Sequence, residues 1–169
     1  MASETLRFLV QRYGADEWLD AESARERTAA RRIPPQIEGM RSLRMQEMTV
    51  PAEAMDVAGL SRELAAAPRS PIYYTDSTWT PEEEAESPRR LVHLRTFECE
   101  SGAAARAQLL QLLAEMQGPA LERTDVAGDV AFATRGNTLI AGVSGSEAFL
   151  LSNGGAELMD LSRIAAELF

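Results

Sequence analysis

The chain has 169 residues and a formal net charge of −9, with 45% hydrophobic and 25% charged residues. This length suits one domain of ordinary size that can bury a substantial core. The acidic net charge disfavours binding to nucleic acids or to anionic membranes. No apolar run approaches the roughly 18 residues of a membrane-spanning helix, and no signal peptide is visible. We therefore expect a cytoplasmic protein, while noting that a mature exported form would have the same sequence.

The inventory of reactive side chains excludes several kinds of chemistry. All 17 basic residues are arginine, so the chain has no lysine for a P-loop or a Schiff base. One cysteine (Cys99) and one histidine (His93) cannot form a disulfide, a thiolate zinc site or a clustered-histidine site within one chain. We expect neither a metal nor a cofactor.

Residues 1–35 predict a helical N-terminal segment. Leu6, Leu9 and Tyr13 recur at helical spacing, Ser3 can cap the helix, and Gly14 can break it. A strand in which residues 6, 8 and 10 share a face is the alternative interpretation.

The end of this segment carries the densest basic cluster in the chain. One interpretation is an anion-binding or partner-docking patch; the other is a helix whose last turn carries cations that complement the helix dipole. The cluster consists of Arg25, Arg27, Arg31 and Arg32.

The middle of the chain predicts an edge strand, a helix and a loop. Residues 42–50 alternate imperfectly, as edge strands often do, and residues 53–67 have apolar side chains at helical spacing. After a short strand at residues 72–74, residues 75–89 predict a long acidic loop. Loops of this length often have a function of their own.

A strand and a helix follow this loop. In residues 90–99, Val92 and Leu94 share one face with Thr96, while His93, Arg95 and Phe97 share the other. Residues 101–117 carry a wide apolar stripe, with a serine able to cap the start and Gly-Pro after the end.

Residues 128–155 predict a three-strand antiparallel meander divided by glycine-containing turns. A further strand is expected at residues 121–126 and a last helix at residues 157–168. Neither face of the meander is clearly polar, so both faces need a cover. We expect the chain's own helices on one face, and the N-terminal segment or a second protein chain on the other.

Together these elements predict a single α+β domain over residues 1–169. It would contain a largely antiparallel sheet with a C-terminal three-strand meander, and amphipathic helices packed mainly on one face. A ferredoxin-like split β-α-β arrangement is one possibility.

Two groups of residues are candidates for binding. Tyr73, Tyr74, Asp76 and Trp79 place three aromatic rings within seven residues of the expected loop, where they could grip a ligand or partner. His93 and Arg95 on the next strand could join them.

Two resemblances to catalytic motifs fail. His93 and Cys99 would lie about 20 Å apart on one strand, and Ser144 lacks the second glycine of a nucleophile elbow.

The missing catalytic motifs favour a non-catalytic binding or accessory protein. It would act through a sheet face or the aromatic loop, with a protein partner or as a homodimer. The alternative is a small enzyme or small-ligand-binding domain that uses Tyr74, Asp76, His93 and Arg95 in a pocket between sheet and helices. A third possibility, anion binding through the arginine cluster, predicts a strong salt dependence.

Overall fold

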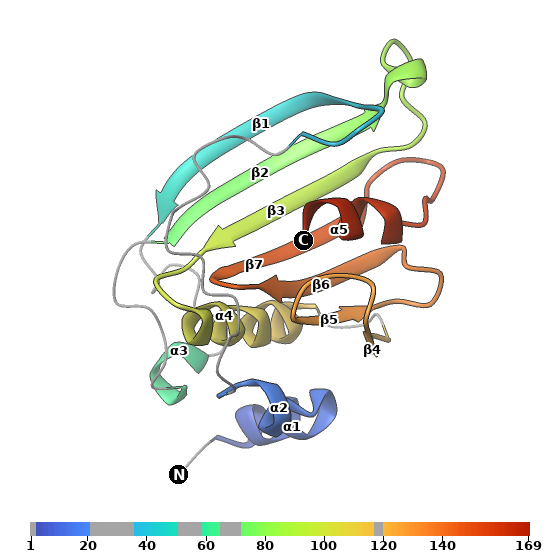
Figure 1. Ribbon diagram of the computed structural model, residues 1–169. Helices are drawn as coiled ribbons and strands as arrows, with labels where there is room; N and C mark the ends of the chain where they lie inside the picture. The colour runs from blue at the N-terminus through green and yellow to red at the C-terminus, as the bar shows by residue number, and fades with distance from the viewer. Residues whose placement is uncertain (1–2, 21–35, 51–58, 65–71, 117–119) are drawn as a thin grey trace.

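A computed structural model describes residues 3–20, 36–50, 59–64, 72–116 and 120–169 (Figure 1). In these residues, seven strands form one open antiparallel sheet in the order β1-β2-β3-β7-β6-β5-β4. The strands are β1 (Met40–Val50), β2 (Ile72–Pro81), β3 (Val92–Glu98), β4 (Glu122–Thr124), β5 (Val130–Ala133), β6 (Leu139–Ser144) and β7 (Glu147–Asn153). The helices are α1 (Glu4–Tyr13), α2 (Ala15–Trp18), α3 (Leu60–Glu63), α4 (Gly102–Glu115) and α5 (Ser162–Leu168).

The sheet consists of two antiparallel meanders that meet along β3 and β7. Strands β1, β2 and β3 form the first, and β4 to β7 form the second, which contains the predicted C-terminal meander. The seam pairs Val92 with Asn153 at one end and Glu98 with Glu147 at the other. The predicted α+β class and the C-terminal meander are confirmed. The ferredoxin-like possibility is wrong. A split β-α-β unit places one strand between the two strands that flank its helix, whereas β7, β6 and β5 all lie between β3 and β4, the strands on either side of α4 in the chain.

Helix α4 covers one face of the second meander, and α1 and α2 lie beyond it (Figure 1). The apolar stripe of α4 packs with side chains of β5, β6 and β7 in a core that also includes Trp18 and Leu60. Ser101 caps α4 by accepting a hydrogen bond from the Ala104 amide at 3.1 Å. Helices α1 to α4 contribute to this one core, so most of the described helices share a face, as predicted.

Helix α5 covers the other face of the meander (Figure 1). Leu161, Ile164 and Leu168 are buried there against Phe149 and its neighbours. The Phe169 ring stacks on Phe149 with centroids 3.8 Å apart. We expected the N-terminal segment or a second chain on this face, and that expectation is wrong, because α5 covers it. A short helix is sufficient because the strands of the meander are short.

The N-terminal prediction is confirmed in the part that the structure describes. Ser3 Oγ accepts a hydrogen bond from the Leu6 amide at 3.2 Å, and Gly14 ends α1 in the left-handed conformation with φ 61°. The alternative strand is wrong, since these residues are helical. The arginine cluster at residues 25–32 lies outside the described residues.

The predicted acidic loop is too long, because residues 75–81 belong to β2. Thr75, Ser77 and Trp79 alternate inward along this strand and are buried. The polar composition of residues 75–89 predicted a loop, but threonine and tryptophan are residues that strands favour. The loop starts only at the 3-10 turn Glu82–Glu84.

Two helix boundaries also differ from the sequence prediction. Helix α5 starts at Ser162 rather than at residue 157, because the Asn153 side chain bonds both the amide and the carbonyl of Met159, which keeps the chain before the helix irregular. Of the helix predicted at residues 53–67, the described part forms α3 at Leu60–Glu63. No helix in the described residues is long and apolar enough to cross a membrane.

Candidate functional site

The first meander has two unlike faces. On the α5 side, Thr75, Ser77 and Trp79 of β2 and the facing residues of β3 are at most 6% exposed. The Thr75 and Thr96 hydroxyls are hydrogen-bonded to each other in this layer. On the opposite side, Phe97 of β3 is buried, but most of the other β2 and β3 side chains are polar or aromatic and partly exposed. The α5 side therefore builds the core, and most of the opposite side remains accessible.

We call the accessible side the β1–β3 polar face. Its residues follow from the strand register, in which Asp76 lies opposite Arg95 and Thr78 opposite His93. Strand β1 extends the same rows with exposed side chains, since it pairs with β2 along its whole length. The face consists of Arg44, Gln46, Met48, Tyr74, Asp76, Thr78, His93 and Arg95.

At the centre of this face, a tyrosine hydroxyl separates an arginine from an aspartate. Arg95 Nε donates a hydrogen bond to Tyr74 Oη at 3.1 Å, and Tyr74 Oη donates to Asp76 Oδ2 at 3.1 Å. Arg95 and Asp76 are direct cross-strand neighbours, yet the hydroxyl bridges them in place of an ion pair. Within the described residues, no hydrogen bond or ion pair engages the two Nη groups of Arg95.

Aromatic rings fix the position of this guanidinium. The Arg95 Cζ atom lies 5.7 Å from the Tyr74 ring centroid and 5.5 Å from that of Phe97, within the range of cation–π attraction. Burial raises the pKa of Tyr74 above its usual 10.0, against the opposing influence of Arg95. Tyr74 is therefore a neutral hydroxyl at pH 7 that can donate to Asp76 while accepting from Arg95.

Thr78 and His93 form a second polar pair beside the first. Thr78 Oγ1 and His93 Nδ1 are 3.0 Å apart. The other edge of the imidazole packs against the backbone of Gly154, where a Cβ atom would overlap Nε2. His93 is thus held between a strand hydroxyl and the end of β7.

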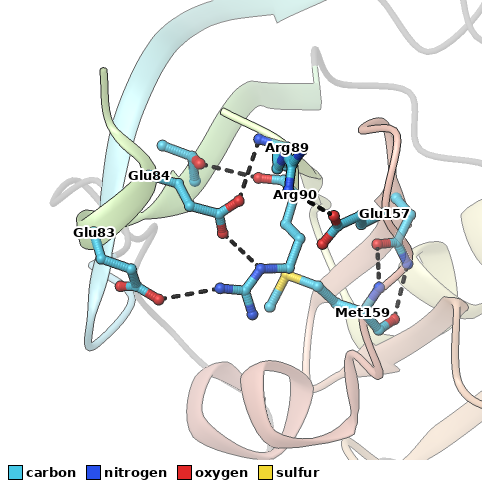
Figure 2. Close-up of polar contacts among 8 residues, drawn as sticks. Glu83, Glu84, Arg89, Arg90, Glu157 and Met159 are labelled. Atoms are coloured by element: carbon cyan, nitrogen blue, oxygen red, sulfur yellow. Dashed lines mark hydrogen bonds and ion pairs between the residues drawn. The ribbon is translucent and has the colours of Figure 1, made fainter. Parts of the chain in front are cut away.

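The loops at one end of the polar face are joined by polar contacts (Figure 2). Arg90 donates to Glu84 at 2.6 Å and to Glu83 at 3.1 Å. Arg89 Nη1 lies 3.6 Å from Glu157 Oε1, and the Glu157 amide donates to the Arg89 carbonyl at 3.1 Å. The β2–β3 loop is therefore fastened to the segment between β7 and α5.

The pKa of Glu84 reflects the hydrogen bonds that this residue accepts within the β2–β3 loop. Desolvation acts to raise the pKa of Glu84, but the hydrogen bonds from Arg90 and from the Arg89 amide outweigh it and lower the pKa. Much of the acidic run therefore serves to hold the β2–β3 loop in place.

The structure brings together four of the six predicted binding residues and separates two. Tyr74, Asp76, His93 and Arg95 share the polar face. Tyr73 lies on the opposite side of β2, where its hydroxyl donates to Glu47 at 2.8 Å. Trp79 is 4% exposed in the core and donates through Nε1 to Ser77.

The rejected catalytic pair, His93 and Cys99, does not come together. His93 lies within β3 and Cys99 just after its end, where the thiol donates to the Phe97 carbonyl at 3.6 Å. Desolvation raises the pKa of Cys99 to about 12, so the thiol is protonated near neutral pH. In the part of the chain that is described, no group of three or more His, Cys, Asp or Glu residues could hold a metal ion.

Sequence reasoning missed Thr78 and the exposed residues of β1. The threonines at positions 75, 78 and 80 were the available signal, because β-branched residues favour strands over loops. Comparison of the chain with protein families, curated proteins and solved structures found no match. Its function therefore has to be inferred from its own residues.

Proposed function

We propose that this chain is a non-catalytic binding protein that holds a partner against the β1–β3 polar face. One observation carries the proposal: Arg95 is held in a fixed position by Tyr74 and Phe97 while its Nη groups stay unengaged within the described residues. A guanidinium fixed in this way binds a carboxylate or phosphate oxygen at a low entropic cost, since its side chain is already ordered.

The surrounding side chains add to this binding capacity. Asp76 uses one carboxylate oxygen for Tyr74, and Gln46 extends the same cross-strand row on β1. Donors, acceptors and both signs of charge thus lie side by side on one face of the sheet, which suits a protein partner. The net charge of −9 makes a nucleic acid or an anionic membrane a poor partner.

The arrangement of titratable groups supports binding over catalysis. His93 bonds Thr78, while Asp76 bonds Tyr74, so the described contacts do not join the imidazole to a carboxylate. A general acid–base pair requires such groups within reach of the same substrate atom.

Site-specific photo-crosslinking in the cells that produce the protein tests this proposal. A benzophenone amino acid replaces Thr78 on the polar face, and in a control variant it replaces the exposed Arg163 of α5. We expect one adduct of discrete mass from position 78, reduced at least severalfold by Arg95→Gln, and no such adduct from position 163. Equal adducts at the two positions, or none at 78, would refute the proposal.

A small-ligand or catalytic site on the same face is the second candidate function. The contact between Thr78 Oγ1 and His93 Nδ1 favours it, because a hydroxyl bonded to an imidazole is the arrangement of a nucleophile and its base. Hydrolysis of p-nitrophenyl acetate is a suitable assay. If this candidate is right, the protein hydrolyses the ester, His93→Gln abolishes the hydrolysis, and Ser152→Ala, a change on the neighbouring strand, preserves it. Equal rates of hydrolysis in the two variants would count against a catalytic site.

A further inference from the structure

Strand β1 is unusually exposed for its length. It has 11 residues and forms one edge of the sheet. Between residues 41 and 49, every side chain is exposed except that of Met45. Leu43 and Met48 are 45% and 46% exposed, and they are two of the four exposed large hydrophobic residues in the described part of the chain. Strand β1 therefore has few buried side chains for its length.

The outer edge of β1 has no strand beside it in the described residues. In the described sheet, β1 pairs with β2 alone. Figure 1 shows that α4 and α5 lie over the other half of the sheet, around β3, β7 and β6. A long edge with free backbone amides and carbonyls is a template for another strand.

We propose that β1 pairs antiparallel with β1 of a second copy of this chain about a two-fold axis at Gln46. This inference extends the proposed function, because the pairing joins the polar faces of both copies into one six-stranded surface. Each partner-binding face would then be completed by the second copy.

The sequence of β1 favours this register over one centred on the neighbouring Glu47. In an antiparallel pair, two facing residues point to the same side of the sheet, so their numbers within the strand must both be odd or both be even. Two identical strands related by a two-fold axis can satisfy this only when one residue faces its own copy, and the axis then passes between those two residues. The register with β2 is irregular between Ser42 and Arg44, which leaves residues 44–50 for regular pairing. Their middle residue, Glu47, would place two carboxylates opposite each other.

An axis at Gln46 avoids that repulsion. Arg44 then faces Met48 of the second copy, Met45 faces Glu47, and the two Gln46 amides face each other. No like charges are opposed, and the aliphatic part of each arginine covers an exposed methionine. A second copy is the one partner that must carry this matching edge, which favours it over an unrelated strand.

Substitutions at Met48 test both the dimer and its register. Met48→Glu would create two ion pairs with Arg44 across the axis, whereas Met48→Arg would oppose two arginines. By sedimentation velocity of the full chain, we expect wild-type dimers, a dissociation constant lowered about fivefold by Met48→Glu and raised about fivefold by Met48→Arg. Leu158→Glu and Leu158→Arg are matched controls at another exposed position. They should leave the dissociation constant of the dimer unchanged.

A disulfide test gives a second, independent readout. Facing residues in an antiparallel pair are close enough for a disulfide, so Gln46→Cys should give a covalent dimer with oxidised glutathione. Thr49→Cys is the control on the same strand, since its two copies would lie about 20 Å apart. The natural Cys99, as a protonated thiol, should not compete.

Two results together would overturn the dimer. The wild-type protein would sediment as a single chain at every concentration, and the Gln46→Cys and Thr49→Cys variants would form disulfide-linked dimers to the same extent. The proposed function would survive those results if the photo-crosslinker at position 78 still captured a protein of a different mass in an Arg95-dependent way. If the position 78 crosslinks also failed, both proposals would fall.

Discussion

The imidazole of His93 rests directly on the backbone of Gly154, so that the end of β7 and the polar face share one close contact. Glycine is needed there for space, since any Cβ atom would overlap the ring. The Gly154 amide also donates to the Leu91 carbonyl at 2.9 Å. These two contacts bring the β2–β3 loop and the β7–α5 segment together.

Gly154→Ala should therefore destabilise the protein by about 1–3 kcal/mol, the usual cost of overpacking. The added methyl must displace His93 and break its bond to Thr78. Urea denaturation measures the change. In a His93→Ala background the ring is absent, so the same substitution should cost much less; an unchanged cost would contradict the contact as the cause.

Asn153→Ala should cost about 2–3 kcal/mol, because three hydrogen bonds of this side chain are lost. Asn153 Nδ2 donates to the Thr138 and Met159 carbonyls at 2.8 and 2.9 Å, and Oδ1 accepts from the Met159 amide at 2.8 Å. Thermal unfolding measures the loss.

Asn153→Asp is the informative companion to that variant. It keeps the acceptor for the Met159 amide but places a carboxylate against two carbonyl oxygens. We expect it to be at least as destabilising as alanine. An Asn153→Asp protein of wild-type stability would mean that the two donated bonds contribute little.

Arg95→Gln should raise the pKa of Tyr74 still further above 10.0, because the guanidinium charge and its hydrogen bond are the influences that lower it. Asp76→Asn should shift it in the opposite direction, since the carboxylate raises it. The measurement is an NMR pH titration of tyrosine ring carbons, with Tyr74→Phe to identify the signal. Shifts of the same sign in both variants would contradict the bridging hydroxyl.

Cys99 should make stability fall at alkaline pH. Desolvation, followed by the nearby carboxylates of Glu147 and Glu98, raises its pKa in the folded protein to about 12 from an ordinary 9.0. The unfolded chain therefore loses this proton first, so the contribution is complete below pH 9 and is lost as the pH rises towards 12.

The slope should be at most about 1.4 kcal/mol per pH unit in that window. Urea denaturation of wild type and Cys99→Ala between pH 8 and 10.5 measures it, and the difference between the two proteins isolates the thiol. Parallel stability profiles would show that the thiol environment does not oppose ionisation.

The sequence predicted those elements whose apolar spacing repeats cleanly. The stripe of α4 and the glycine-divided strands β5, β6 and β7 agree with prediction because local pattern and burial coincide there. The prediction failed for β2, where Thr75 is hydrogen-bonded to Thr96 and Ser77 to the Leu94 carbonyl of β3, which are distant in sequence.

The same distinction applies to the candidate site. Tyr73, Tyr74, Asp76 and Trp79 were predicted as a group from their closeness in sequence. Strand alternation decides the grouping instead, which is why Tyr73 and Trp79 turn to the other side. The edge position of β1 was predicted from its imperfect alternation, but the neighbours of Gln46 and Met48 on the polar face follow only from the register with β2.

The seam between β3 and β7 has a consequence for how this protein folds. Each meander can assemble from neighbouring strands, but the seam pairs residues such as Phe97 and Ala148 that are far apart in sequence. Closing so long a loop is slow because its entropy must be lost before the contacts form. We expect the two meanders to acquire amide protection separately, with the seam last, so a nascent chain released before β7 would expose β3 as a second open edge.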